Sequence, residues 1–487
     1  MKYRVSALIL AALLLASCGG GTDTPGVQTD APGGNTQETE PAVTERVPAP
    51  TDLPEVDYSG ETFTVWMRST NVSYAVTDVI SEGSDGEIIN DSVFDRNTRL
   101  EDHFGITLEG AAKDEPSKDA KMEIMSGSDS FDIITDCMTN LNSLASESYL
   151  VDWYSLPCFD PADAWWDENA AKNLSMAGKL YMMVSDVSMN ASSRARFLYI
   201  NKKIASDYDI EIPYDLVREG KWTWDKFTEM VNTVSADLNG DGVMDGSDLW
   251  GMLIENPEYF LSGCGVLFTE KDADDIPVLS LVTDRNASVV EAVSELWNNK
   301  KCAINYDNAT KDVPLGNFAH IYDLGRSMFA SDHFLFLQNG ANVAYQFANM
   351  QSEYGILPNP KFDEAQAEYH HLMDPFACAW SIPITSGDPE MTDVIMNWWG
   401  YLSSNTLVDA FYESTIKYKR LNAPEDAEML DIIRSSIRYE FSSIAEVGVL
   451  EVVRNAVSKG NLASTYEKRS KSIAKQLDKL LAAYLGE

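Results

Sequence analysis

The alternation of strand and helix patterns from residue 62 onward is the feature that most constrains how this chain folds. Phe63, Val65 and Met67 stand at every second position of TFTVWMR, which predicts a strand with a buried face. Apolar residues then recur at helical spacing over 89–104, and GITLEG at 105–110 predicts a second strand. A strand, a long helix and a strand in this order favour a βαβ unit with a parallel sheet.

Similar patterns continue to the end of the chain. Strands are predicted in FDIIT, in GKLYMMVSDVS and in three segments of the last third, HFLFLQNGANVAY, YGILPNPKF and ACAWSIPIT. Helices are predicted between them, as in KWTWDKFTEMVNTVS, and the last segment, ASTYEKRSKSIAKQLDKLLAAY, is a polar amphipathic helix suited to packing on a surface. About 430 folded residues are too many for one ordinary core, so we expect an α/β fold in two lobes.

The N-terminal segment MKYRVSALILAALLLASC has the features of a signal peptide. Lys2 and Arg4 precede an apolar run over 5–15, which is too short to span a membrane as a helix of the mature protein. The run ends in LASC, which resembles the lipobox of bacterial lipoproteins. That resemblance implies a lipid thioether on Cys18, cleavage after Ser17 and anchoring to the extracytoplasmic side of the cell membrane. The alternative is an ordinary secreted protein.

Residues 18–57 are predicted to be a disordered tether between the signal peptide, 1–17, and the folded part. The segment is rich in Gly, Pro, Thr and acidic residues and contains almost nothing that forms a core. The sequence after it has no apolar run of about 18 residues. We therefore expect the folded part to begin near Tyr58 and to be tethered to the membrane through the lipid alone.

The chain carries 76 acidic and 37 basic residues, a formal net charge of −39. A surface this acidic repels nucleic acid and anionic lipid, and it argues against an acidic substrate unless a local basic pocket overrides the average. The five cysteines after Cys18 form no CxxC pair, and we expect them to be buried apolar residues rather than a disulfide framework or a zinc site. The five histidines lack the HExxH spacing of a catalytic zinc site.

Residues 237–248, DLNGDGVMDGSD, have the spacing of a calcium-binding loop. Asp, Asn and Asp stand at loop positions 1, 3 and 5, Gly242 permits a sharp turn, and the carbonyl at position 7 adds an oxygen. The predicted ligands of a structural calcium ion are Asp237, Asn239, Asp241, Val243, Asp245 and Asp248. The strand pattern LWGMLIE follows in place of a second helix, so we expect a fixed brace rather than a calcium switch. The alternative is an acidic turn held by side-chain to backbone hydrogen bonds.

The order of several segments resembles the extracellular solute-binding proteins of carbohydrate ABC transporters. The segments are FTVWMR, INDSVFDRNTRLEDHFGI, FDIITDCMT, GKLYMMVSDVS, LYINKKIASDYDIEIPYDLVREGKWTWDKF, YGILPNPKFDEAQAEYHH and SIPIT. The resemblance implies a two-lobed periplasmic-binding-protein-like fold of type II, in which each lobe is a mostly parallel sheet flanked by helices and crossover strands join the lobes. We assign 58–186 and about 330–375 to the N-terminal lobe, and 187–329 and about 376–487 to the C-terminal lobe.

The resemblance also implies a function. It is that of a lipid-anchored, monomeric substrate-binding subunit, not an enzyme, which captures a sugar or oligosaccharide between closing lobes and delivers it to membrane permease subunits. One alternative is a surface-anchored glycoside hydrolase, because acidic residues are abundant, although the sequence contains no nucleophile elbow, zinc motif or phosphate loop. The other is a binding subunit that feeds a membrane sensor.

Ligands of open α/β sheets bind at the carboxyl ends of the strands, and this rule, with the resemblance, selects candidate cleft residues. The candidates are Trp66, Arg68, Asp136, Thr139, Asp186, Tyr259 and Gln338. Aromatic faces pack on the apolar faces of sugar rings, and carboxylates and amides bond the hydroxyls, so the set suits a neutral sugar. For Trp165 and Trp166 we leave two possibilities open, the rim of the cleft and structural packing.

Overall fold

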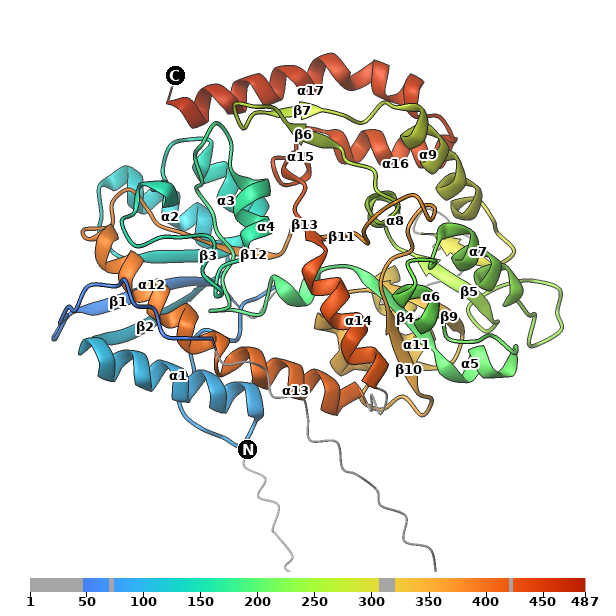
Figure 1. Cartoon of the computed structure of the whole chain (residues 1–487), viewed down its shortest axis with the longest axis horizontal. Coiled ribbons are helices and arrows are strands. Elements are labelled where there is room, and N and C mark those ends of the chain that lie inside the picture. Colours follow the sequence, from blue (N-terminus) through green and yellow to red (C-terminus); the bar gives the residue numbers. More distant parts are fainter. Residues whose placement is uncertain (1–46, 70–73, 306–319, 420–423, 487) are drawn as a thin grey trace, which may run out of the picture. The chain divides into compact units, whose positions relative to one another are not determined.

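Two β-sheets organise the described part of the chain, which in this computed structural model comprises residues 47–69, 74–305, 320–419 and 424–486. The first sheet has four strands in the order β12-β3-β1-β2 (Figure 1). The strands are β1 (Thr62–Arg68), β2 (Thr107–Lys113), β3 (Ile133–Cys137) and β12 (Cys378–Ser381). β1 is parallel to β2 and β3, whereas β12 is antiparallel to β3.

The predicted βαβ unit is confirmed. Helix α1 (Ile88–Phe104) connects the parallel neighbours β1 and β2 and buries Val93 and Leu100. The helix ends at Gly105, whose φ of 70° lies in the left-handed region. A Cβ atom at this position would collide with the Ser59 hydroxyl group. Glycine fits this turn both because of its backbone conformation and because of the close neighbour.

The second sheet has five strands in the order β10-β4-β9-β5-β8. They are β4 (Phe197–Asn201), β5 (Trp250–Ile254), β8 (Ala303–Asn305), β9 (Phe334–Asn339) and β10 (Tyr354–Leu357). β4 is antiparallel to β9 and β10, whereas β5 is parallel to β8 and β9. The sheet is therefore mixed rather than mostly parallel. We refer to the half built on the four-stranded sheet as the first lobe and to the half built on the five-stranded sheet as the second lobe.

The expected division of the chain between the lobes is wrong for β9, β10 and β12, whereas the helices Pro424–Ser435 and Val449–Lys459 do pack in the core of the second lobe as expected. We assigned 330–375 to the first lobe and the segment from 376 onward to the second, but β9 and β10 pair with β4 in the second sheet. β12 returns to the first sheet, where Cys378 to Ser381 pair with β3. These strands are buried along their whole length, so their apolar runs predict strands without indicating which sheet they join.

The predicted strand in GKLYMMVSDVS is wrong. The segment forms only single bridges within the described chain, from Lys179 to Met176, from Met183 to Trp380 and from Ser185 to Trp166. Leu180, Met182 and Met183 are nevertheless fully buried in the core of the first lobe. The apolar pattern there reflects burial of an irregular segment rather than pairing along a neighbouring strand.

The helices surround both sheets. Beside the first sheet lie α1, α2 (Pro116–Ser126), α3 (Met138–Ala145) and α12 (Pro389–Ser404). Beside the second lie α5 (Lys202–Asp207), α7 (Trp224–Thr233), α9 (Asp284–Trp297), α11 (Ile321–Ala330) and α14 (Pro424–Ser435). The other helices are α4 (Glu168–Leu174), α6 (Tyr214–Arg218), α8 (Glu258–Gly263), α13 (Leu407–Lys419), α15 (Phe441–Ile444), α16 (Val449–Lys459), α17 (Leu462–Leu485), η1 (Trp153–Ser155), η2 (Ser192–Arg194) and η3 (Ala341–Phe347).

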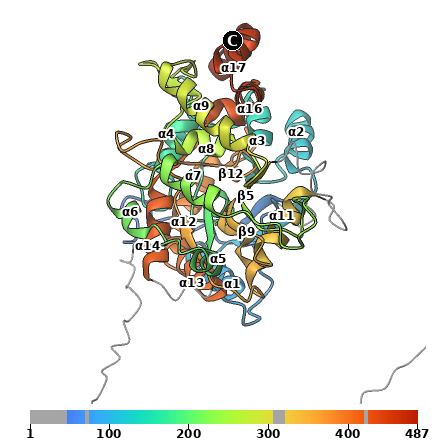
Figure 2. The same cartoon turned by 90° about the vertical axis from the view of Figure 1, so that its right-hand side faces the viewer.

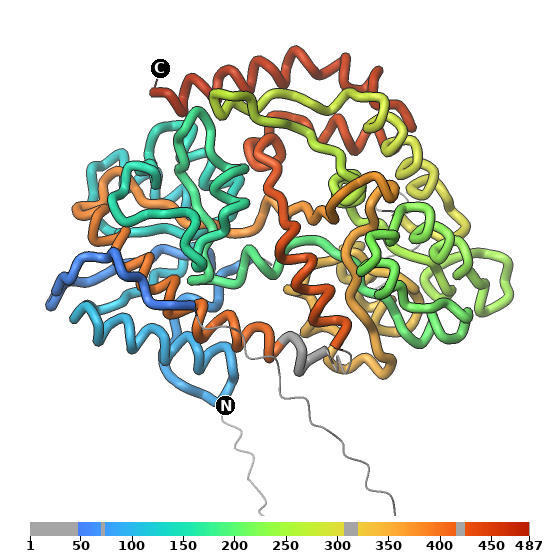
Figure 3. Tube along the Cα trace, in the orientation of Figure 1, coloured from blue at the N-terminus to red at the C-terminus, as the bar shows by residue number. Residues whose placement is uncertain are grey.

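Short strands and crossovers complete the fold. β11 (His371–Leu372) pairs in parallel with β13 (Ile437–Arg438), and β6 (Thr269–Lys271) forms a hairpin with β7 (Pro277–Leu279). Figure 3 traces the chain as it passes between the two sheets before β4 through 187–196, between β11 and β12 through 373–377, and again between α12 and α14 through α13. These crossovers join the lobes and border the space between them.

Helix α17 contacts both lobes. Near its start it packs against α16 and α9 at the outer edge of the second lobe (Figure 1, Figure 2). Near its end Leu480 and Tyr484 belong to the apolar core of the first lobe. The predicted amphipathic helix is therefore confirmed. In the described ranges we find no helix that combines the length and the apolar character needed to cross a membrane.

Candidate functional site

A cavity of about 720 Å³ lies between the two sheets, at the ends of strands from both. Thr139 follows the carboxyl end of β3, Glu255 follows that of β5, and Asn339 is the last residue of β9. Because the carboxyl ends of neighbouring parallel strands open at one edge of a sheet, the residues that follow them meet at this cavity.

Aromatic side chains from both lobes line the cavity. They are Tyr74, Tyr259, Trp297, Tyr322 and Phe376. The rings of Tyr74 and Phe376 stack with their centroids 5.6 Å apart, and Phe376 is 45% exposed. Phe376 therefore presents an accessible apolar face on the side of the first lobe, where a flat apolar surface of a ligand can pack.

Charged side chains on the second-lobe side are arranged in pairs. Arg196 donates to Asp374 at 2.7 Å and to the side-chain oxygen of Asn339, and its guanidinium lies 5.3 Å from the centre of the Tyr259 ring. Arg454 donates to Glu258 in the same way. Four arginines and four acidic side chains line the cavity, so opposite charges nearly balance there. This balance favours a neutral, hydrogen-bonding ligand over an anion.

Glu255 is the carboxyl group of the cavity lining whose pKa burial raises toward neutral pH. Its side chain is 5% exposed and accepts a hydrogen bond from Asn339 at 3.3 Å. Burial raises its pKa to about 7, and the nearby Arg196 and Arg326 lower the pKa only in part. The carboxyl therefore gains and loses its proton near neutral pH. Glu255 can donate a hydrogen bond to a ligand when it is protonated, and it only accepts hydrogen bonds when it is ionised.

Of the predicted cleft residues, Thr139 and Tyr259 line this cavity. Arg68 and Asp136 instead form a buried ion pair, with a guanidinium nitrogen 2.7 Å from a carboxylate oxygen. Asp136 also accepts hydrogen bonds from Ser117 at 2.6 Å and from Asn140 at 3.1 Å. This pair joins β1 and β3 under the cavity wall, where it is positioned to hold the strand ends.

The other predicted cleft residues lie elsewhere. Trp66 stacks on Phe131 at 4.3 Å within the core of the first lobe. Gln338 is buried and donates to Asn359 at 3.0 Å. Asp186 borders a separate cavity of about 340 Å³, where it accepts from Ser404 at 2.8 Å. Contact with a ligand stays a prediction for each of the candidate residues.

Trp165 and Trp166, for which two possibilities were open, serve structural packing. Both are at most 5% exposed, and both indole nitrogens donate to the side-chain oxygen of Asn397, at 2.9 and 3.0 Å. Neither ring lines the cavity between the sheets. The burial of both rings favours the structural interpretation for this pair.

Several residues of the cavity escaped the sequence analysis. Asn339 is the neighbour of the predicted Gln338, and because side chains of a strand alternate between faces, an error of one residue selects the wrong face. Glu255 directly follows the predicted strand LWGMLI, so the strand-end rule was sufficient to find it. Arg196 and Asp374 are 178 positions apart and meet through the crossovers, which no local pattern reveals.

The predicted calcium loop is closed by its own hydrogen bonds. Asp237 accepts from the backbone N–H groups of Gly240 and Gly242, each at 2.7 Å. Asp248, which is fully buried, accepts from those of Leu238 at 2.9 Å and Asp245 at 2.7 Å. The oxygen donors suit a hard cation, but no group of three or more carboxylate, histidine or cysteine side chains gathers as a metal site within the described ranges. Calcium binding stays a prediction.

The predicted lipidation site, Cys18, lies outside the described residues. The five later cysteines, which the structure describes, are free thiols, and all but Cys158 are buried. This burial agrees with the expectation that they act as small apolar residues.

Comparison with known proteins supports the fold. No known protein family and no curated protein matches this sequence. Among solved structures, the chain resembles a cyclo/maltodextrin-binding protein complexed with maltotetraose, with 15% identity, a TM-score of 0.53 and coverage of 87% of this chain and 96% of that one. It also resembles the ABC substrate-binding protein Lmo0181 from Listeria monocytogenes in complex with cycloalternan, with 11% identity, a TM-score of 0.51 and coverage of 88% of this chain and 98% of that one. A third similar structure is UspC of M. tuberculosis, with 12% identity, a TM-score of 0.54 and coverage of 85% of this chain and 100% of that one. The chain therefore has the two-lobed fold of periplasmic binding proteins.

Proposed function

We propose that this protein is the substrate-binding subunit of an ABC importer and captures a sugar or oligosaccharide between its two lobes. The observation that carries the proposal is the cavity of about 720 Å³, which both lobes line with aromatic rings and hydrogen-bonding side chains. Its volume lies in the range of small-ligand sites. The names of the similar structures, a maltodextrin-binding and a cycloalternan-bound protein, support a carbohydrate as the ligand.

The lining suits the two kinds of surface that a pyranose presents. Phe376, stacked on Tyr74, offers an accessible ring for the apolar C–H face of a sugar. Asn339 and Asp374 offer oxygens, and Arg196 offers N–H groups, for the hydroxyls around the edge of the ring. Because the charges of the lining balance, we assign the ligand to the neutral sugars.

Binding and release follow from the division of the lining between the lobes. A ligand that contacts Phe376 on one side and Tyr259 on the other is held fully only when the lobes are close, so it shifts the population toward the closed arrangement. A permease that recognises this arrangement then receives only loaded protein. The protein binds, orients and shields the sugar from water, and no covalent bond changes.

A panel of neutral oligosaccharides tests the proposal by thermal shift and then by calorimetry. A ligand raises the melting temperature because it binds only the folded state. We expect Phe376→Ala to weaken the affinity for the best ligand at least about tenfold, since it removes the accessible stacking face. The matched control is Phe94→Ala, another exposed phenylalanine, on α1 away from the cavity. A panel without any stabilising sugar, or an equal loss in both variants, would contradict the proposal.

The glycoside hydrolase alternative gives a different result in the same samples. A buried carboxyl with a pKa near 7, Glu255, is the kind of group that serves as a general acid. A binding protein leaves an oligosaccharide intact during prolonged incubation, whereas a hydrolase releases new reducing ends. Release that disappears in Glu255→Gln would favour the hydrolase.

We further propose that the protein is anchored through a lipid on Cys18, on the extracytoplasmic side of the membrane. The sequence LASC at 15–18 supports this assignment. Cys18→Ala is expected to move the protein from the membrane fraction to the culture medium, because a lipid supplies the anchoring free energy. Metabolic labelling with a clickable palmitate analogue provides a second readout, and label retained in Cys18→Ala would assign the lipid to another residue.

A further inference from the structure

Two of the free cysteines face each other across neighbouring strands. In the antiparallel pairing of β3 with β12, Cys137 is the direct partner of Cys378. The backbone N–H of Met138 donates to the carbonyl of Ala377 at 3.0 Å, so the cysteines occupy a non-hydrogen-bonded position of the ladder. Their own N–H groups donate outward, to Asp136 at 2.7 Å and to Asn190 at 2.9 Å.

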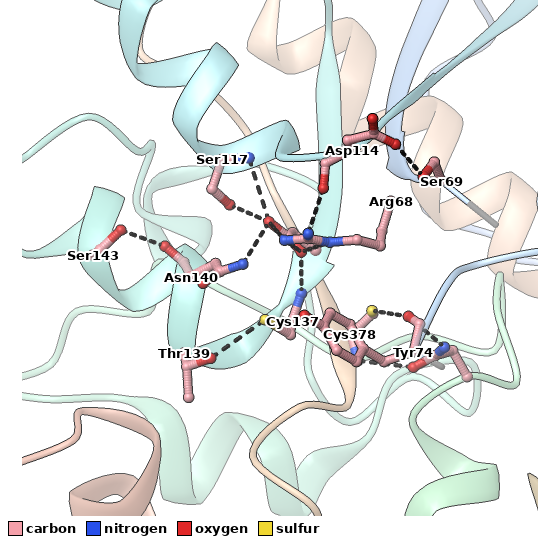
Figure 4. Close-up of polar contacts among 12 residues, drawn as sticks. Arg68, Ser69, Tyr74, Asp114, Ser117, Cys137, Thr139, Asn140, Ser143 and Cys378 are labelled. Atoms are coloured by element: carbon pink, nitrogen blue, oxygen red, sulfur yellow. Dashed lines mark hydrogen bonds and ion pairs between the residues drawn. The ribbon is translucent and has the colours of Figure 1, made fainter. Parts of the chain in front are cut away.

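This position satisfies the distance requirement of a disulfide. Directly opposite residues in a non-hydrogen-bonded antiparallel pair have Cα atoms about 4.5 Å apart and side chains on the same face, and disulfides span Cα distances of roughly 4.4–6.8 Å. At present the sulfur of Cys137 lies 3.3 Å from the Thr139 hydroxyl, and the thiol of Cys378 lies 3.4 Å from the Tyr74 carbonyl (Figure 4). Both are weak hydrogen bonds, so rotation about the Cα–Cβ bonds costs little.

We propose that Cys137 and Cys378 form a cross-strand disulfide when the protein folds in an oxidising compartment. The oxidant is a disulfide of low-molecular-weight thiols. One cysteine thiolate attacks it, forming a mixed disulfide and releasing one small thiol. The second cysteine thiolate then displaces the other small thiol and closes the Cys137–Cys378 bond. The two cysteines lose two electrons and two protons in total, and the oxidant is reduced to two thiols.

The step belongs to folding rather than to the finished structure. The two side chains are only 1% and 5% exposed, so a small-molecule oxidant has little access to them. Burial also raises the pKa of Cys137 to about 11 and that of Cys378 well above its usual value, which leaves little thiolate in the folded protein. The bond therefore forms before β12 is fully docked on β3, and once formed it is shielded from reductants.

The bond would hold the cavity wall of the first lobe. Thr139 follows Cys137 by two residues, and Phe376 precedes Cys378 by two, and both line the cavity. Because the cross-link closes a long loop of the unfolded chain, it stabilises the folded state. The inference rests on the strand register and on the export predicted from residues 1–17, and it does not depend on the identity of the ligand.

Peptide mapping of the full chain tests the inference directly. The protein is refolded with and without a glutathione redox buffer, alkylated in denaturant without reduction, digested and analysed by mass spectrometry. After oxidative refolding we expect the Cys137 and Cys378 peptides to be linked, while Cys158, Cys264 and Cys302 are alkylated. Full alkylation of Cys137 and Cys378 after oxidative refolding would overturn the inference, as would linkage of either to another cysteine.

The melting temperatures of the oxidised and the reduced protein give a second test, in which each protein is compared only with itself. We expect the oxidised wild type to melt about 5 °C or more above the reduced protein. Cys378→Ala should melt at one temperature under both conditions, whereas the control Cys264→Ala, another buried cysteine, should keep the difference. If Cys378→Ala does not fold, the wild-type and Cys264→Ala comparison still decides, because equal melting of oxidised and reduced protein contradicts the bond.

Discussion

Glu255 illustrates at the scale of one residue how the fold changes the chemistry of a side chain. Arg196, Arg326, Asp374 and Asp323 surround it, yet burial dominates and raises its pKa to about 7. In the unfolded chain the same carboxyl titrates near its ordinary value of 4.5. Between these two values the folded protein binds more protons than the unfolded chain, so folding stability falls as the pH rises.

The first prediction concerns this pH dependence. Relative to Glu255→Gln, the wild type should lose up to about 3 kcal/mol of unfolding free energy between pH 5 and 8, and little more above that range. Glutamine keeps the oxygen that accepts from Asn339 and cannot ionise. Urea unfolding of both proteins at several pH values measures the difference. A difference that stays constant over this range would show that Glu255 titrates normally.

At the scale of one element, the loop 237–248 allows a test that separates its two interpretations. Asp241 accepts from the N–H of Val243 at 2.8 Å through a single carboxylate oxygen, and asparagine can replace this acceptor. Asp241→Asn therefore keeps the turn but removes one charge from a calcium site. The substitution changes metal binding far more than it changes the loop hydrogen bonds.

We expect calcium to raise the melting temperature of the wild type relative to chelator, and to raise that of Asp241→Asn much less. Magnesium at the same ionic strength is the control for general screening of the acidic surface. Equal melting of the wild type with calcium, with magnesium and with chelator would identify the loop as an acidic turn without an ion.

At the scale of the whole molecule, α17 links the cores of the two lobes. Leu462, Ile473 and Leu477 belong to the core of the second lobe, whereas Tyr484 belongs to that of the first. The Tyr484 hydroxyl lies 3.2 Å from the Asn142 side-chain oxygen, and Tyr181 donates to the Tyr484 carbonyl at 3.3 Å. One helix therefore couples the stability of both halves.

Tyr484→Ala should weaken this coupling. Removal of a buried aromatic side chain costs about 3–5 kcal/mol, and here the loss falls on the first lobe. We expect calorimetry to show the first lobe melting earlier, so that the unfolding transition broadens or divides. Lys475→Ala, at an exposed position of the same helix, is the control and should melt like the wild type. A single sharp transition in Tyr484→Ala at the wild-type temperature would show that α17 does not couple the lobes.

The elements that were predicted well are those whose signal is local. The spacing of apolar residues predicts β1, α1 and α7, because burying one face of a strand or helix requires a period that is visible within a few turns. The segment LWGMLI is confirmed as β5, a short apolar run that is buried at every position. The buried runs of β9 and β12 also predict strands, but a run that is apolar on both faces has no preferred partner in the sequence.

The sequence by itself determined the α/β class, the division into two lobes and most elements, since periodicity and length depend on neighbouring residues and on the area a core can bury. Only the tertiary structure decided which strands share a sheet and which side chains share the cavity. Asp136 looked like a cleft residue at a strand end, yet Arg68 holds it in a buried pair, while Arg196 and Asp374 meet across 178 positions. The physical reason is that tertiary packing determines which groups form hydrogen bonds and ion pairs. Residues far apart in the sequence can become partners as readily as near neighbours.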